Sequence, residues 1–286
     1  MQRDVTLRTH DDGIDAWEMA SAAPAPHLAG VVDRYTDYRE RTGSFTARRE
    51  LASTGGVMIV NLGDPLEIVG ANGRTLRLLR GEGFAGGLAD ATSISRSNGA
   101  QSGIHLHAPL ETIARLLGLP PSEIANRVVR LDEALGAEGI RLGEEVAEAG
   151  SAEDRFARLD SFVTARLAAS HAGDRRVAAA GAALRDRPDT PIAALAERLN
   201  ADRRAFARDF RNVLGIPPRH YARLARFESF TAAIAAEPAA SLADLAADAG
   251  YYDQPHLNRD VRAFADMTPA DLQRRIVPNG GGVRHD

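Results

Sequence analysis

The spacing of hydrophobic residues changes from strand-like to helical near residue 110. Between 55 and 107 short apolar runs alternate with polar positions and glycine, as in VMIVNL at 57–62 and SGIHLHA at 102–108. PLEIV, the turn GANG and RTLRLL together predict a hairpin. Weak alternation also favours a strand near 31–37, and GEGFAGGLAD at 81–90 is predicted as a glycine-rich turn. Many short strands separated by glycine predict a small barrel or sandwich.

Helical spacing follows this β-rich part. PLETIARLLGLP at 109–120 places apolar residues every three or four positions, and PSEIANRV predicts a second helix with Ser122 as its cap. Residues 151–169 predict a longer helix that Ser151 caps, with an apolar stripe through Phe156, Leu159 and Leu167. The polar stretch near 170–176 is the best candidate for a linker.

Two similar patterns then occur about fifty residues apart, at 190–215 and 241–261. Each has a short apolar helix, a break, an aspartate cap and a second amphipathic helix, which is the pattern of a helix-turn-helix. Asp202 and Asp253 are the predicted caps, and the segment between the two patterns predicts one long connecting helix. The last nine residues, PNGGGVRHD, are predicted to be a disordered tail.

The second helix of each pattern presents polar side chains opposite its apolar stripe. Arginine favours phosphate and guanine, and glutamine and asparagine can read adenine through paired hydrogen bonds in the major groove. These faces predict a DNA contact rather than a merely solvated surface, because the same arrangement occurs twice. The candidate DNA-binding residues are Arg203, Arg204, Ala207, Arg208 and Arg211 in the first unit, and Gln254, Pro255, Asn258 and Arg259 in the second.

Composition is that of a soluble globular chain, with 44% hydrophobic and 26% charged residues among 286. All 35 basic residues are arginine, and the absence of cysteine excludes disulfides and thiolate zinc sites. The net charge of −4 is unevenly divided, since residues 174–286 carry about two net positive charges. An acidic chain with a basic end remains compatible with DNA binding. No segment has the length of a signal peptide core or a membrane span, so we expect a cytoplasmic, nucleoid-associated protein.

Residues 190–276 resemble the DNA-binding domain of AraC/XylS-type transcriptional regulators. The resemblance rests on LAERLN, RAFARDFRNVLGIPPRHYARLARFESF and SLADLAADAGYYDQPHLNRDVRAFADMTPADLQRR. It implies two helix-turn-helix units joined by a rigid helix and reading two successive major grooves. It places contacts at Arg204, Ala207 and Arg208, and at the four second-unit candidates. Ala207 and Pro255 depart from this role because neither side chain can donate a hydrogen bond to a base.

The first 170 residues are more weakly similar to the sensor domain of some actinobacterial AraC-type regulators, through GFAGGLAD, SGIHLHAPLETIARLLGLP and RVVRLDEALG. The expected fold is therefore α+β. A β-rich, cupin-like barrel or sandwich with flanking helices (1–172) would precede an all-α domain of two helix-turn-helix units joined by a long helix (173–277), and 278–286 would form the tail. Candidate effector-binding residues are Tyr35, Tyr38, Met58, His105 and His107.

A metal site is the competing interpretation of the β-rich part. Gly99, His105, His107, Glu111 and Gly118 have a spacing that resembles the first metal motif of cupins. The two histidines would share one face of a strand, as two ligands of one metal must. However, Glu111 lies in a predicted helix after Pro109, and a second cupin motif is missing. We therefore expect no cofactor, and the two histidines are more simply polar residues of a strand.

The leading hypothesis is a sequence-specific transcriptional regulator without enzymatic activity. Its expected partners are an operator in double-stranded DNA, RNA polymerase, an unknown small-molecule effector and a second copy of the chain, but no membrane. One alternative is a metal-dependent, cupin-like enzyme that the helical domain carries to DNA. Another is constitutive DNA binding with an N-terminal domain that only dimerises. The apolar stripe of 151–169 could supply that interface, or it could pack on its own β-domain.

Overall fold

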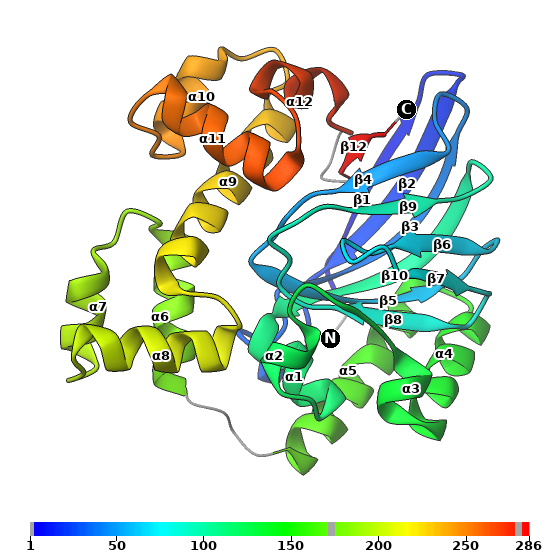
Figure 1. Cartoon of the computed structure of the whole chain (residues 1–286). Coiled ribbons are helices and arrows are strands. Elements are labelled where there is room, and N and C mark those ends of the chain that lie inside the picture. Colours follow the sequence, from blue (N-terminus) through cyan, green and yellow to red (C-terminus); the bar gives the residue numbers. More distant parts are fainter. Residues whose placement is uncertain (1–2, 171–174, 278–281, 286) are drawn as a thin grey trace.

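The structure is a computed structural model that describes residues 3–170, 175–277 and 282–285. A β-rich N-terminal domain and a helical C-terminal domain lie side by side (Figure 1). The predicted boundary at 172–173 and most of the predicted linker fall within 171–174, outside the described residues. The predicted combination of a β-rich first domain and an all-α second domain is confirmed.

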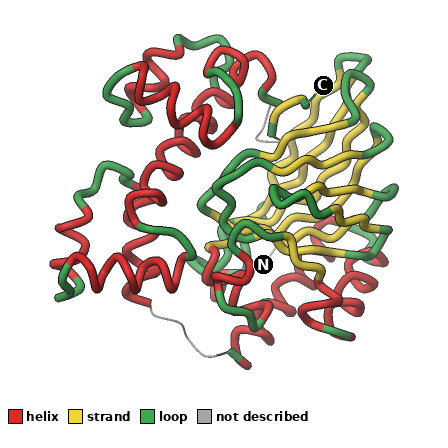
Figure 2. The backbone as a smooth tube through the Cα atoms, viewed as in Figure 1, coloured by secondary structure: helices red, strands yellow, loops and turns green. Residues whose placement is uncertain are grey.

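Two antiparallel sheets form the N-terminal domain, seen as the yellow strands of Figure 2. The larger has the order β1-β2-β3-β10-β5-β8-β11 and the smaller the order β12-β4-β9-β6-β7. The bounds in the larger sheet are β1 Val5–Asp11, β2 Asp15–Ala22, β3 Arg34–Thr42, β5 Gly55–Asn61, β8 Gly83–Gly86, β10 Ala100–Pro109 and β11 Val128–Arg130. Those in the smaller are β4 Ala47–Glu50, β6 Leu66–Val69, β7 Thr75–Leu78, β9 Ser93–Arg96 and β12 Val283–Arg284. The predicted hairpin is β6 with β7, in which Leu66 pairs with Leu78.

One face of the larger sheet packs against helices, and the other faces the smaller sheet. The helices of this domain are the short 3-10 helix η1 (Pro26–Leu28), α1 (Leu110–Leu117), α2 (Pro121–Ile124), α3 (Leu131–Leu135), α4 (Ala137–Glu148) and α5 (Ala152–Ala169). On the helical side, the Tyr35 hydroxyl donates to Asp160 of α5 at 2.9 Å. Between the sheets, a small separate apolar cluster consists of Leu66, Ile68, Leu78 and Phe84.

Helix α5 begins as the sequence predicts, because the Ser151 side chain accepts a hydrogen bond from the Asp154 N–H at 3.1 Å. Its apolar stripe faces its own domain: Phe156 and Val163 are fully buried and Leu159 almost so. Because packing on the sheet already covers these side chains, the stripe is not an open surface for a second copy.

The helical domain consists of α6 (Arg175–Asp186), α7 (Ile192–Arg198), α8 (Arg203–Leu214), α9 (Pro218–Ala236), α10 (Leu242–Asp248), α11 (Gln254–Ala265) and α12 (Pro269–Arg275). The long helix α9 runs between the α7–α8 pair and the α10–α11 pair (Figure 1). Its buried face carries Tyr221, Leu224, Phe227 and Ile234. A single helix therefore supports both units, as the sequence predicts.

Three local predictions need correction. GEGFAGGLAD contains strand β8 rather than only a turn; at Gly83 a Cβ would lie 2.7 Å from the Ile59 carbonyl oxygen, so the glycine allows close pairing. Ser122 does not cap α2, which begins at Pro121 and has Pro120 at its N-cap. Part of the predicted disordered tail is ordered, since Val283 and Arg284 form β12.

Candidate nucleic-acid interface

The first helix-turn-helix unit is α7 and α8. The Asp202 side chain caps α8 by accepting hydrogen bonds from the backbone N–H groups of Arg204 at 2.8 Å and Ala205 at 3.0 Å. The same two N–H groups, that of Ala205 first, lower the pKa of the Asp202 carboxyl. Phe206 and Phe210 are buried at i and i+4, and their rings meet edge to face at 5.6 Å. The cap and the aromatic pair fix which face of α8 points outward.

That outward face carries the predicted arginines. Arg203, Arg204, Arg208 and Arg211 are exposed, and Ala207 is half-buried between them. The Arg208 guanidinium lies 3.2 Å from the Asp209 carboxylate, but both side chains are exposed, so the pair is weak. An arginine-rich first turn is unfavourable at the positive end of the helix dipole. An external anion such as a DNA phosphate would relieve this repulsion.

The second unit is α10 and α11. Ser241 caps α10 through the Ala243 N–H at 3.3 Å, and Asp253 caps α11 through the His256 N–H at 2.8 Å. Leu257, Val261 and Phe264 form the buried face of α11. On the opposite face Gln254, Pro255 and Arg259 are exposed and Asn258 is half-buried. The structure thus places all nine predicted DNA-binding residues on the two capped helices, away from their apolar faces.

A buried ion pair that the sequence does not reveal ties α11 to α9. Asp260 is fully buried, and one of its oxygens accepts hydrogen bonds from the Arg223 Nη2 at 2.7 Å and Nε at 3.0 Å. The guanidinium of Arg223 also lies 5.4 Å from the centre of the Phe264 ring. Arg223 and Asp260 are 37 positions apart, so local periodicity carries no signal for their contact. The pair fixes the position of α11 on α9.

Tyr252 is a second feature absent from the sequence prediction. It immediately precedes the cap residue of α11 and is 94% exposed, the largest value among the exposed large hydrophobic residues of the described chain. Its neighbour Tyr251 is buried instead, with its ring against Phe230 and His256. The exposed aromatic side chain of Tyr252 therefore lies two residues before the start of α11.

The five candidate effector residues divide between the two faces of the larger sheet. Tyr38, His105 and His107 lie on the face toward the smaller sheet, where the ring centres of Tyr38 and His105 are 4.6 Å apart and those of the two histidines 5.5 Å. Tyr35 and Met58 alternate with these residues along their strands and lie on the opposite face, buried toward the helices. Only three of the five could thus share one site.

Charged groups lie near these three rings between the sheets. Burial lowers the pKa of His105 to about 3, so its imidazole is neutral near pH 7. Burial also raises the pKa of the Glu50 carboxyl, whereas Arg48 forms a buried ion pair with Glu40 at 2.9 Å. The sheet face that carries these three rings therefore presents neutral hydrogen-bonding groups. Beside them lies the ion pair of Arg48 and Glu40, whose charges offset each other.

The candidate ligands of the competing metal-site interpretation are not assembled into a site. His105 and His107 belong to β10, whereas Glu111 lies in the first turn of α1. Across residues 3–170, 175–277 and 282–285, no group of three or more histidine, aspartate or glutamate side chains is arranged to hold a metal ion. In the same residues, no helix combines the length and the apolar character needed to cross a bilayer.

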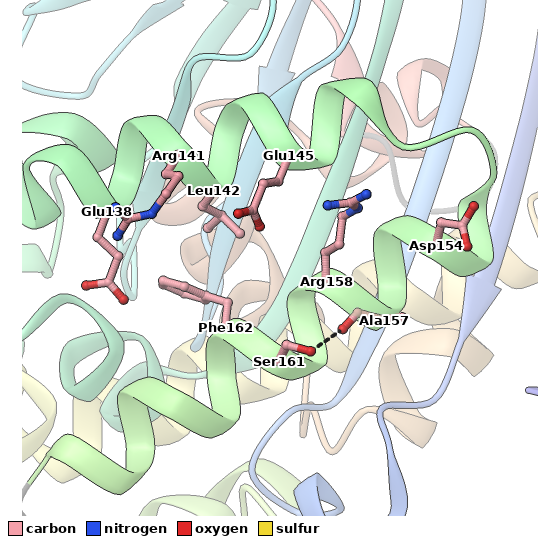
Figure 3. Close-up of a pocket in the computed structure, with 9 residues that line it drawn as sticks. All are labelled: Glu138, Arg141, Leu142, Glu145, Asp154, Ala157, Arg158, Ser161 and Phe162. Atoms are coloured by element: carbon pink, nitrogen blue, oxygen red, sulfur yellow. Dashed lines mark hydrogen bonds between the residues drawn. The ribbon is translucent and has the colours of Figure 1, made fainter.

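Two surface hollows add further candidate sites. A groove of about 510 Å³ lies between α4 and α5. In Figure 3 its apolar lining residues Leu142 and Phe162 lie among side chains of both charges. A smaller hollow of about 410 Å³ lies where Arg49 of β4 meets α11 and α12, with Arg262 and Arg275 among its lining residues. None of the five candidate effector-binding residues lines either hollow.

Comparisons with known proteins agree with this geometry. The family described as "Helix-turn-helix domain" matches residues 195–275. No curated protein matches the chain in a sequence comparison. ToxT from Vibrio cholerae aligns over 85% of this chain and 98% of that chain, with 10% identity and a TM-score of 0.52. ToxT from the same organism, with an unsaturated fatty acid bound, aligns over 80% of this chain and 93% of that chain, with 8% identity and a TM-score of 0.50. The AraC-like transcriptional activator CuxR aligns over 85% of this chain and 90% of that chain, with 14% identity and a TM-score of 0.30.

The match to the helix-turn-helix family and the fold together define a DNA-binding transcription regulator, in which a β-rich domain precedes a double helix-turn-helix. The helix-turn-helix domain, at residues 195–275, is of the AraC type.

Proposed function

We propose that the protein binds an operator through both recognition helices and that a small molecule held by the N-terminal domain controls this binding. One observation carries the proposal: α8 and α11 each have a side-chain cap, a buried apolar face and an outward face of base-reading or phosphate-binding residues. Helix α9 supports both, so the two helices can enter successive major grooves as one body.

The two recognition helices differ in chemistry. Helix α8 presents mainly arginine, which binds phosphates regardless of sequence, whereas α11 combines amide and guanidinium groups that distinguish bases. We therefore assign much of the affinity to residues 203–211 and most of the discrimination to residues 253–259. Because phosphate contacts release counterions, operator affinity should fall steeply as salt concentration rises.

The proposed effector site is the face between the two sheets around Tyr38, His105 and His107. ToxT, which shares the fold, has been solved with an unsaturated fatty acid bound, and this supports a ligand-binding role for the N-terminal domain. A ligand can regulate this chain only if it binds one arrangement of the two domains more tightly than another. Homodimerisation, contact with RNA polymerase and a cytoplasmic location beside the nucleoid belong to the same proposal.

Single substitutions test the DNA contacts. Arg208→Ala and Arg259→Ala should each weaken operator binding by about 1–3 kcal/mol, because each removes one guanidinium from the proposed interface. Arg77→Ala, which changes an exposed arginine on β7 of the N-terminal domain, is the matched control and should leave affinity unchanged. Fluorescence anisotropy with a duplex recovered by selecting bound fragments from the host genome measures all three. Wild-type affinity in both interface variants would exclude this surface.

A further inference from the structure

The C-terminal residues return to the N-terminal domain after the second helix-turn-helix ends. Strand β12 pairs antiparallel with β4, so that Val283 lies opposite Arg49 and Arg284 opposite Arg48. The His285 N–H donates to the Ala47 carbonyl oxygen at 3.1 Å. Figure 1 shows this short red strand at the edge of the smaller sheet, although it belongs to the opposite end of the chain.

Side-chain contacts add to the backbone pairing of the strand. Val283 is fully buried. The Arg284 guanidinium lies 3.6 Å from the Asp15 carboxylate and 5.7 Å from the centre of the Phe45 ring. Arg284 therefore combines an ion pair with a cation–π contact, and both partners lie in the N-terminal domain.

The other side of β12 is attached to the end of the helical domain. The Val277 N–H donates to the Gly282 carbonyl oxygen at 2.9 Å, and Ile276 forms a β-bridge with Val283. Ile276 directly follows α12, which packs beside α11. A displacement of β12 would therefore act on the end of α12 and, through it, on α11.

A contact beside β12 also links the N-terminal domain to the second helix-turn-helix unit. The Arg49 side chain on β4 donates to the Ala265 carbonyl oxygen at 3.0 Å and lies 3.3 Å from the Asp266 carboxylate. Ala265 is the last residue of α11, and Asp266 follows it in the left-handed conformation. One end of the second recognition helix thus rests on the strand that β12 covers.

Other contacts join the N-terminal domain to the connecting helix rather than to the second unit. Glu228 of α9 accepts hydrogen bonds from the hydroxyls of Ser53 at 2.9 Å and Thr54 at 2.5 Å. His220, also on α9, lies 2.9 Å from the Asp90 carboxylate. Within the part of the chain that the structure describes, the second unit therefore contacts the N-terminal domain directly through β12 and Arg49, in addition to its packing on α9.

We propose that β12 is an intramolecular strap: by completing the open edge of the smaller sheet it holds the second helix-turn-helix unit against the N-terminal domain. Without it, β4 would be an edge strand with unpaired backbone groups. The strap gives the N-terminal domain a direct mechanical link to the helix that discriminates bases. Its effect on DNA binding rests on the proposed function, whereas its structural role can be tested without DNA.

Gly282 allows the strap to be loosened by one substitution. Its φ is +76°, and a Cβ there would lie 2.4 Å from the Arg49 carbonyl oxygen, so Gly282→Ala combines backbone strain with a backbone clash. Gly73→Ala is the matched control: its φ is +75°, but nothing lies within 4 Å of its Cβ position in the β6–β7 turn. A chain that ends at Gly281 removes the strap entirely.

Native-state hydrogen exchange measures the strand pairing. In Gly282→Ala the amides of β4 should exchange about tenfold faster than in the wild type, because exchange there requires β12 to open. Gly73→Ala should leave β4 exchange unchanged. Equal β4 exchange in the wild type and in the chain ending at Gly281 would refute the pairing.

Single-molecule energy transfer measures the attachment of the second unit. The chain has no cysteine, so dyes attach only where a cysteine is introduced. Ala71→Cys in the β6–β7 turn and Ala247→Cys on α10 place one dye in each part, because both positions are exposed. We expect one narrow distance distribution in the wild type and Gly73→Ala, and a broader one in the chain ending at Gly281. An unchanged narrow distribution in the truncated chain would overturn the strap.

DNA-binding measurements on the full chain and on the chain ending at Gly281 distinguish a failure of the strap proposal from a failure of the proposed function. For genomic fragments that the full chain selects, we expect the chain ending at Gly281 to change affinity at least about threefold, since fewer contacts then hold the second unit against the N-terminal domain. Equal affinity would refute the regulatory role of the strap. If the full chain selects no fragment, the proposed function fails, while exchange and energy transfer still decide whether the strap exists.

Discussion

Arg223→Ala is expected to lower the free energy of unfolding of the helical domain by about 3 kcal/mol, because it leaves Asp260 buried without its counter-charge. The value lies at the low end for a broken buried pair, since the Arg223 side chain is 36% exposed whereas that of Asp260 is fully buried. Loss of the pair should also loosen α11 on α9 and weaken operator binding without touching any proposed DNA contact.

Urea unfolding followed by two probes checks this expectation. The chain has a single tryptophan, Trp17 in the N-terminal domain, whereas the helical domain contributes strongly to far-UV circular dichroism. The circular dichroism midpoint should fall while the Trp17 fluorescence transition changes less. Arg223→Met combined with Asp260→Leu should recover much of the loss, because an apolar pair leaves no buried charge. A full-sized loss in that double variant would show that packing, not charge, dominates at this site.

Two triple substitutions should separate affinity from discrimination. Replacing Arg203, Arg208 and Arg211 with alanine removes three exposed guanidinium groups from α8. We expect binding to all duplexes to weaken on the order of a hundredfold, and the slope of log affinity against log salt to decrease by about 2.7. Replacing Gln254, Asn258 and Arg259 should instead reduce the preference for operator over unrelated DNA on the order of a hundredfold.

Fluorescence anisotropy over a range of NaCl concentrations, with operator and unrelated duplexes, measures both quantities. Thermal unfolding of each variant serves as a control, because all six side chains lie outside the apolar faces of their helices. The assignment of roles would be reversed if the α8 variant lost its sequence preference while the α11 variant lost its salt dependence. If both variants lost affinity and sequence preference to the same extent, α8 and α11 would contribute equally to affinity and to discrimination.

Much of the helical domain was predictable because its signals are local. Caps such as Asp202 and Asp253 act within three residues, and the apolar faces through Phe206 and Leu257 repeat every three or four positions. These features set the limits of α8 and α11 and the direction in which each outward face points. The candidate DNA-binding surface therefore follows from short-range spacing.

The β-rich domain was less predictable because pairing in a sheet is non-local. β3 pairs with β10, which lies far along the sequence, and β10 pairs in turn with β5. Strand β1 is almost entirely exposed, and β2 is mostly half-buried without a regular alternation, so neither strand has a pattern that predicts it. Alternation within a strand also separates Tyr35 from Tyr38, but only the stacking of the two sheets shows which of them faces the inner space.

The sequence by itself determined two capped recognition helices, the connecting helix and the chemistry of their exposed faces, because those properties depend on residues within a few turns of one another. Only the tertiary structure decided that Arg223 holds Asp260, that the stripe of α5 is covered, and that the last residues complete a sheet begun at Ala47. These contacts join positions that are far apart in the sequence. Their free energy arises only when distant segments of the chain have packed together, and no local pattern records it.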